Sequence, residues 1–258
     1  MHKKLKILLS IIFLFLGVTL QAEPQTIAII GAMDVEVAEI AARLQHPKTY
    51  SDNHFNVTTG VIGPYKIVLA KSGVGKVNAA IMTQFLIDHF HPHYLINVGI
   101  AGSLDRNIKV GHMLLINKAV QHDFDLTAFG YAKGYIPTNG NAKQPTFYEP
   151  TPADLLEFYT RRLSELLPHL RVQTGTIVSG DVFVHKKSDK RYLRRTFKAV
   201  AVDMESAAIA QTAQANGVPL VILRTISDKE NDSAATYIRN EKDIAQQAAD
   251  ALATILEN

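Results

Sequence analysis

Apolar and polar positions follow two patterns along the chain, one typical of strands and the other of helices. Short runs rich in β-branched residues predict buried strands, and most of them end at a glycine, a serine or an acidic residue. Stretches with apolar residues three and four positions apart predict helices. Strands are expected at residues 26–30, 56–61, 65–70, 94–98, 110–120, 173–178, 199–202 and 219–226. Helices are expected at residues 34–44, 76–90, 152–167, 205–215 and 241–256.

Strands that alternate with helices predict an α/β fold, in which a mixed central sheet is flanked by helices. The apolar run Val221-Ile222-Leu223 is typical of a strand buried on both faces. The length of the chain suits a single domain of this class. Ligands of such folds bind at the carboxyl ends of the strands, so segments far apart in the sequence are expected to converge on one pocket.

The first 22 residues differ in composition from the rest. Three lysines lie among the first six residues, and an uncharged, mostly apolar run from Ile7 to Ala22 follows. A basic start, a short apolar centre and a small residue at the end predict a secretory signal peptide, although an uncleaved anchor is the alternative. The apolar part is short for a membrane span, which needs ~20 residues. We therefore expect a periplasmic or secreted domain at residues 23–258, without stable membrane association.

Loss of the signal peptide changes the charge of the chain. Without its three lysines, the 27 basic residues fall to 24, which equals the number of acidic residues, and the formal net charge changes from +3 to zero. One basic cluster remains, formed by Lys186, Lys187, Lys190, Arg191, Arg194 and Arg195. Tyr192 is the only aromatic residue in it, whereas surfaces that bind nucleic acid usually interleave aromatic rings. We interpret the cluster as a solvated helix face and expect no nucleic-acid partner.

Residue types exclude several kinds of chemistry. The chain has no cysteine, which excludes disulfides, catalytic thiolates and zinc–thiolate sites. His89, His91 and His93 alternate, but their place in a polar loop before a strand favours solvated side chains, and no metal or other cofactor is expected. The turn at residues 73–76 lacks the spacing of a phosphate-binding Walker loop. It is interpreted as a tight turn that brings backbone close to a ligand.

Four charged residues lie in or next to the predicted strands and helix starts. Asp228 follows a long apolar strand, where apolar surroundings favour a neutral carboxyl and suit a general acid; capping the next element is the alternative. Glu205 could hold a vicinal diol such as a ribose and Glu36 could activate water, or both could serve a helix dipole. Arg224 lies in an apolar strand and must find a partner, for which Glu36 and Glu205 are the candidates; the pairing would keep these acids ionised. The set fits acid–base hydrolysis of a sugar bond.

Seven short segments, in this order along the chain, form a pattern that can be compared with known families. The first three are Ile29–Met33 with Glu36, Lys71–Val77, and Asn97–Gly99 with Ala101 and Gly102. The other four are His122 and Asp123 with Asp125 and Thr127–Tyr131, Val178–Asp181 with Phe183, Met204 and Glu205 with Ala207, and Arg224 with Ile226–Asp228. Together they resemble the 5′-methylthioadenosine/S-adenosylhomocysteine nucleosidases of the nucleoside phosphorylase superfamily. The resemblance implies a nucleoside phosphorylase-like fold and hydrolysis of the N-glycosidic bond of these nucleosides to adenine and the thioribose. 5′-Deoxyadenosine and aminodeoxyfutalosine are further candidate substrates.

The same resemblance implies roles for individual residues. Glu36 would deprotonate the attacking water, Asp228 would protonate N7 of adenine, and Glu205 would hold the ribose hydroxyls. Arg224 would support the water and the acids, and Ser227 would orient Asp228. The other implied substrate-binding positions are Met33, Val74, Ala101, Gly102, Phe183, Val184 and Met204. A homodimer with shared sites would complete the 5′ pocket with Leu126, Phe129 and Pro137 of the neighbouring subunit.

Two places depart from the family pattern. Ile100 stands where the family usually has serine, which removes a hydroxyl near the ribose. The loop at residues 229–235 also differs, which leaves Tyr237 as the candidate for the aromatic residue that closes the site.

Two other functions are alternatives. A nucleoside phosphorylase would need a phosphate site, which the acidic Glu36 disfavours. A secreted nucleoside-binding protein without turnover is disfavoured by the presence of Glu36, Glu205 and Asp228 together.

Overall fold

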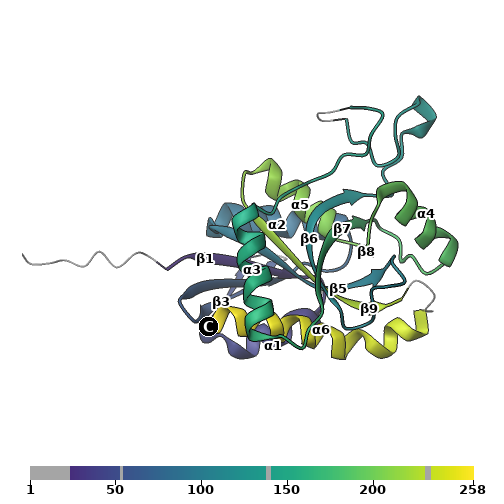
Figure 1. Ribbon diagram of the computed structural model, residues 1–258. Helices are drawn as coiled ribbons and strands as arrows, with labels where there is room; N and C mark the ends of the chain where they lie inside the picture. Colours follow the sequence, from purple (N-terminus) through teal and green to yellow (C-terminus); the bar gives the residue numbers. More distant parts are fainter. Residues whose placement is uncertain (1–23, 53–54, 138–140, 230–233) are drawn as a thin grey trace, which may run out of the picture.

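The computed structural model describes residues 24–52, 55–137, 141–229 and 234–258, which form one sheet with helices on both faces (Figure 1). The strands are β1 (Thr26–Gly31), β2 (Gln45–Asp52), β3 (Phe55–Ile62), β4 (Tyr65–Lys71), β5 (Tyr94–Ser103), β6 (Met113–Gln121), β7 (Val172–Ser179), β8 (Ala201–Asp203) and β9 (Leu220–Asp228). The helices are α1 (Asp34–Arg43), α2 (Lys76–Phe90), α3 (Ala153–Leu166), α4 (Lys187–Phe197), α5 (Ser206–Ala215) and α6 (Ala234–Glu257), with a short 3-10 helix, η1, at Thr127–Phe129. The predicted α/β class and mixed sheet are confirmed.

The strands follow the order β2-β3-β4-β1-β5-β8-β7-β6-β9 across the sheet. Strands β4, β1, β5 and β9 pair in parallel, so their carboxyl ends lie at one edge. Because β9 pairs with both β5 and β6, the part of the sheet from β5 to β9 closes on itself. This closure brings the end of β8 next to the ends of β5 and β9.

Apolar side chains on both faces hold the sheet between two layers of helices. In β9, Leu220 and Ile222 belong to the cluster that includes residues of α2 and α5. Val221 and Leu223 belong to the opposite cluster, which includes residues of α1, α3 and α6. Successive side chains of a strand point to opposite faces, so the continuous apolar sequence of β9 reflects burial on both sides, as predicted.

Several boundaries differ from the prediction. Strand β2 was not predicted, because its residues are polar and almost all exposed, and it forms the outer strand next to β3. Helix α6 begins at Ala234 and β6 at Met113, rather than at residues 241 and 110. Residues 1–23, on which the predicted signal peptide falls, lie outside the described part. Within that part, no helix has the length and apolar character needed to cross a membrane.

The basic cluster at residues 186–195 requires a correction. Most of its members are exposed on α4, as predicted, but Lys190 is completely buried. Lys190, Leu193 and Phe197 are the buried residues of α4 and share the face that packs onto the protein. These three residues are spaced by three and four positions, as on one face of a helix. Because Lys190 stands among other basic residues, it was not predicted to lie on this buried face.

Candidate active site

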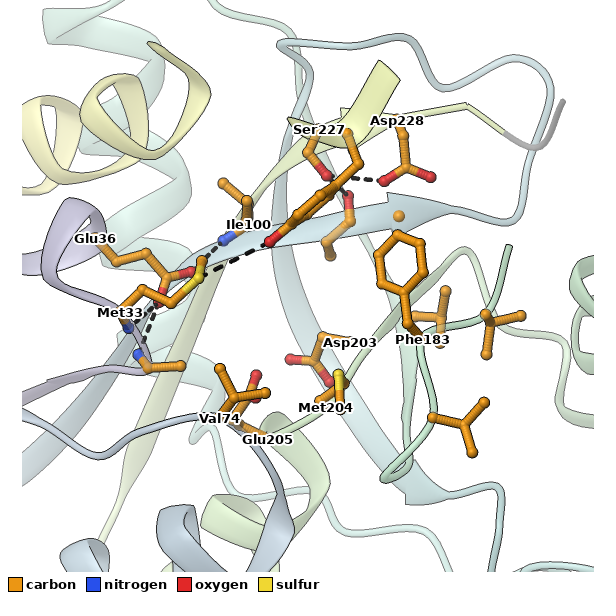
Figure 2. Close-up of a pocket in the computed structure, with 17 residues that line it drawn as sticks. Met33, Glu36, Val74, Ile100, Phe183, Asp203, Met204, Glu205, Ser227 and Asp228 are labelled. Carbon is orange, nitrogen blue, oxygen red and sulfur yellow. Dashed lines mark hydrogen bonds between the residues drawn. The ribbon is translucent and has the colours of Figure 1, made fainter. Parts of the chain in front are cut away.

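A cavity lies at the sheet edge where β1, β5, β8 and β9 end (Figure 2). Its lining residues are Ala32, Met33, Glu36, Val74, Ile100, Ala101, Gly102, Val182, Phe183, Val184, Val202, Asp203, Met204, Glu205, Ser227, Asp228 and Tyr237. Eleven of the predicted site residues are in this set. They are Met33, Glu36, Val74, Ala101, Gly102, Phe183, Val184, Met204, Glu205, Ser227 and Asp228. Segments far apart in the sequence thus converge on one cavity at the strand ends, as predicted.

Glu36 lies in the first turn of α1, and backbone amides hold its carboxylate from two elements. Oε2 accepts hydrogen bonds from the N–H groups of Ala32 at 2.7 Å and Met33 at 3.0 Å, and Oε1 accepts one from Ile100 at 3.0 Å. Burial nevertheless raises the pKa of Glu36, against the opposing effects of the Arg224 charge and these amides. The Ile100 contact uses backbone, so the replacement of the family's serine leaves this donor in place.

Glu205 immediately precedes α5 and reaches the glycine turn before α2. Its Oε1 accepts a hydrogen bond of 3.0 Å from the N–H of Gly75, whose φ of +98° favours glycine. Burial, followed by the nearby Asp203 charge, raises the pKa of Glu205 to about 7, although Arg224 opposes the shift. The glycine turn thus contacts the wall of the cavity, in agreement with its interpretation as a close-approach turn.

Arg224 lies beneath the cavity and not in its lining, and its main partner differs from the prediction. Its Nε and Nη2 lie 3.0 and 2.8 Å from Oδ2 of Asp203, while Glu205 is 3.9 Å away. Nη2 also donates a hydrogen bond of 2.7 Å to Oδ1 of Asn97 on β5. Glu205, one of the two predicted partners, thus forms a longer ion pair with Arg224, while Asp203 is the closer partner that the prediction lacked. The Arg224 charge lowers the pKa of Glu36 and of Glu205, as expected, but burial outweighs it and both pKa values are raised.

Gly99 on β5 explains how Arg224 and Glu36 approach each other. A Cβ atom at this position would collide with both Nη1 of Arg224 and Oε1 of Glu36. Glycine therefore leaves room for the guanidinium and the carboxylate to approach each other in the space that a side chain at this position would fill. Nη1 is buried and has no hydrogen-bond partner among the described groups, so it remains able to donate to a bound molecule.

Asp228 ends β9, and both of its carboxylate oxygens are held. Oδ1 accepts a hydrogen bond of 2.9 Å from the Ser227 hydroxyl, and Oδ2 accepts one of 2.6 Å from Nζ of Lys190. The apolar environment predicted for this carboxyl is therefore wrong in one respect, since a buried ammonium lies beside it. In Figure 2, Asp228 and Glu36 lie on opposite sides of the cavity, with Glu205 on a third side.

Aromatic and sulfur-containing side chains form another part of the wall. The rings of Phe183 and Tyr237 meet edge to face, with centroids 5.1 Å apart. The Tyr237 hydroxyl points to the sulfur of Met33 at 3.8 Å, and Tyr237 lies at the start of α6. Tyr237 thus lines the cavity, and its role as the closing aromatic residue stays a prediction. Residues 230–233 of the divergent loop lie outside the described part.

Leu126, Phe129 and Pro137 do not line the cavity of their own chain. They belong to the connection between β6 and α3, which extends away from the sheet in Figure 1. Phe129 is 76% exposed. Over the described ranges, no group of three or more histidine or acidic side chains has the arrangement of a metal site.

Comparisons with known proteins agree with this geometry. The sequence profile of the Phosphorylase superfamily matches residues 26–258. The 5′-methylthioadenosine/S-adenosylhomocysteine nucleosidase of Staphylococcus haemolyticus is 39% identical over 209 residues, which are 81% of this chain and 88% of that protein. The chain belongs to this nucleosidase family. The predicted enzyme class and the family resemblance are thus confirmed.

Solved structures resemble the nucleosidase over almost its whole length. One is the 5′-methylthioadenosine/S-adenosylhomocysteine nucleosidase from Neisseria meningitidis in complex with methylthio-immucillin-A, with a TM-score of 0.83, 36% identity, and coverage of 90% of this chain and 99% of that one. Another is a futalosine hydrolase of Helicobacter pylori, with a TM-score of 0.83, 32% identity, and coverage of 90% and 97%.

Sequence reasoning missed two charged residues next to the nucleosidase's cavity. Asp203 ends a strand of three residues, and only its position at a strand end pointed to the site. Lys190 stands in a basic run, and only its spacing from Leu193 and Phe197 indicated an inward face. Both residues are buried and pair with charges from β9.

The raised pKa of Glu205 predicts a pH-dependent contribution to stability. Between pH 4.5, its ordinary pKa, and about pH 7, the folded state retains a proton that the unfolded state has lost. Stability must therefore fall as pH rises through this window. Glu205→Gln removes the titration. The free energy of unfolding of the variant minus that of wild type should therefore increase by on the order of 3 kcal/mol as the pH rises from about 4.5 to about 8.

Urea unfolding at several pH values measures this effect. Glu157→Gln, at an exposed position of α3, serves as the control and should follow wild type at every pH. If the free energy of unfolding depended on pH in the same way for wild type and Glu205→Gln, Glu205 would titrate alike in the folded and unfolded states, and the prediction would be wrong.

Proposed function

We propose that the nucleosidase hydrolyses the N-glycosidic bond of 5′-methylthioadenosine and S-adenosylhomocysteine to adenine and the thioribose. The observation that supports this most is the placement of two carboxyl groups, Glu36 and Asp228, on opposite sides of one cavity. A glycosidic bond is broken by protonation of the leaving group on one side and attack by an activated water on the other. Glu36 and Asp228 supply these two functions.

Glu36 acts as the base that takes a proton from the attacking water. Burial raises its pKa, which makes its carboxylate a stronger base, and three backbone amides orient it. The unpartnered Nη1 of Arg224 and this carboxylate both lie beside the missing side chain of Gly99, so Nη1 can hold the water oxygen.

Asp228 acts as the acid for the departing base. Its O–H bond breaks as N7 of adenine takes the proton, and the electron pair of the C1′–N9 bond moves onto the adenine, which leaves as a neutral molecule. General acid catalysis of this kind contributes typically ~10²–10⁴-fold. Ser227 holds the carboxyl toward the cavity.

Glu205 holds the ribose between these two groups. A carboxylate accepts two hydrogen bonds from a vicinal diol, and its negative charge stabilises the cationic sugar of the transition state. Phe183 stacks on the adenine, the backbone of Val184 reads its edge, and Met204 lies beside the sugar; all three line the cavity.

Water is preferred over phosphate because of the charge at this edge of the cavity. Glu36, Asp203 and Glu205 all line it, and a dianion placed among them is repelled. The positive charge of Arg224, which lies beside this group, is offset by its ion pair with Asp203.

Adenine release from purified enzyme tests the proposal. A panel of 5′-methylthioadenosine, S-adenosylhomocysteine, 5′-deoxyadenosine and aminodeoxyfutalosine should be hydrolysed at the same rate with or without inorganic phosphate. Asp228→Asn should lower adenine release by at least ~10²-fold, because the amide cannot donate the proton to N7 in the same way. Strict dependence on phosphate would identify a phosphorylase, and wild-type activity of Asp228→Asn would remove the acid from the mechanism.

We also propose a homodimer in which each subunit completes the 5′ pocket of the other with Leu126, Phe129 and Pro137. Exposed apolar side chains support it. Val77 and Ile81 lie one turn apart on α2 and are 67% and 50% exposed, and Phe129 is 76% exposed. Such side chains on an otherwise polar surface indicate a protein–protein contact.

Ile81→Glu tests the dimer. A charge buried in an apolar interface is costly, so this variant should be monomeric at concentrations where wild type sediments as a dimer. Ile238→Glu, at a 70% exposed position on α6, is the matched control and should remain dimeric. A monomeric wild type, or a dimeric Ile81→Glu, would contradict the proposed interface.

We further propose that the enzyme is exported and that residues 1–22 are removed. The basic start and short apolar centre of this segment support export. Fractionation of the source cells should recover the protein outside the cytoplasm, with a mature N-terminus near Glu23. Recovery of the full-length chain in the cytosol would contradict export.

A further inference from the structure

Lys190 has no part in the reaction as described so far, yet it contacts the proposed acid. It lies on α4, 38 positions before Asp228, and is 0% exposed. Its Nζ donates hydrogen bonds to Oδ2 of Asp228 at 2.6 Å and to the backbone carbonyl of Lys229 at 2.9 Å. One ammonium therefore holds both the carboxylate and the backbone at the point where β9 ends.

A buried lysine is costly, so its position has a physical reason. Removing an ammonium from water destabilises the fold unless a charged partner and hydrogen bonds compensate. Leucine or methionine would fill the same place on α4, beside Leu193 and Phe197, without this cost. Packing alone thus does not account for a cation here, whereas the chemistry of Asp228 does.

The proton transfer creates a charge at Asp228. When its O–H bond breaks and the N7–H bond forms, the neutral carboxyl becomes a carboxylate that is only 4% exposed. Water solvates such a group poorly, so a nearby positive charge must stabilise it. The Lys190 ammonium lies at hydrogen-bond distance from one oxygen of this carboxylate, Oδ2.

We propose that Lys190 is a positioning residue for the leaving-group step. Its ammonium holds Asp228 at the cavity wall and stabilises the carboxylate that forms as the proton moves to N7. The other charged groups of the cavity, Glu36, Asp203 and Glu205, are acidic and oppose this new negative charge. The inference rests on the proposed function, in which Asp228 is the acid.

Two substrates separate this role from a purely structural one. 5′-Methylthioadenosine needs protonation of its leaving group, whereas 4-nitrophenyl 5-methylthioribofuranoside releases a stable phenolate and does not. Lys190→Met should lower kcat for 5′-methylthioadenosine by on the order of 10–10²-fold, with little change in KM, because it weakens but does not delete the acid. Its rate on the nitrophenyl substrate should change by less than about threefold, since the Glu36 and Glu205 side of the reaction is intact.

Further variants test the charge itself. Lys190→Arg keeps the cation and should recover most of the 5′-methylthioadenosine activity, whereas Lys190→Gln keeps an N–H donor without the charge and should behave like Lys190→Met. Lys187→Met, the same change at an exposed position of α4, should leave both rates at the wild-type level.

The results distinguish the possible failures. Wild-type turnover of 5′-methylthioadenosine by Lys190→Met or Lys190→Gln would overturn the inference. An equal loss of both substrates, or loss of the folded state in both neutral variants, would also overturn it, because Lys190 would then be only a structural anchor. If Asp228→Asn itself lost both substrates equally, the acid assignment in the proposed function would fail instead.

Discussion

The guanidinium of Arg224, buried in the middle of β9, and the carboxylate of Asp203 form the ion pair on which the site depends. A cation at this depth is tolerated only with a charged partner and hydrogen bonds on its remaining N–H groups. Asp203 supplies the charge from the end of β8, and Asn97 supplies an acceptor from β5. Ser179 and Ser206 donate hydrogen bonds of 2.5 Å to Asp203, which adds β7 and α5 to the network. Five elements are thereby held together beneath the cavity.

This network determines the electrostatics above it. Because Arg224 is committed to Asp203, its charge offsets only part of the desolvation of Glu36 and Glu205, and the pKa values of both rise. Asp228, on the far side, has a lysine for its partner. Carboxyl groups in one cavity thus differ in their charged partners, Arg224 on one side and Lys190 on the other.

Most of the fold could be predicted, because buried positions are occupied by apolar residues whose spacing is visible in the sequence. Strands such as β9 are apolar throughout since both faces are covered, and their ends carry the polar residues that line the cavity. Strand β2 could not be predicted, because it lies at the outside of the sheet, and nothing in its polar sequence distinguishes it from a loop. The start of α6 was missed for a related reason, since a divergent segment precedes it.

The sequence by itself determined the α/β class, the apolar strands and the acidic residues at their ends, because these depend on local periodicity and on residue type. It also determined the family, through segments that keep their order and spacing. Only the tertiary structure decided which charges meet. Arg224 pairs with Asp203 and not with Glu36. Lys190 is buried, unlike its basic neighbours on α4, and contacts Asp228. Ion pairing depends on distance and desolvation in three dimensions, and a sequence pattern records neither across the 38 positions that separate Lys190 from Asp228.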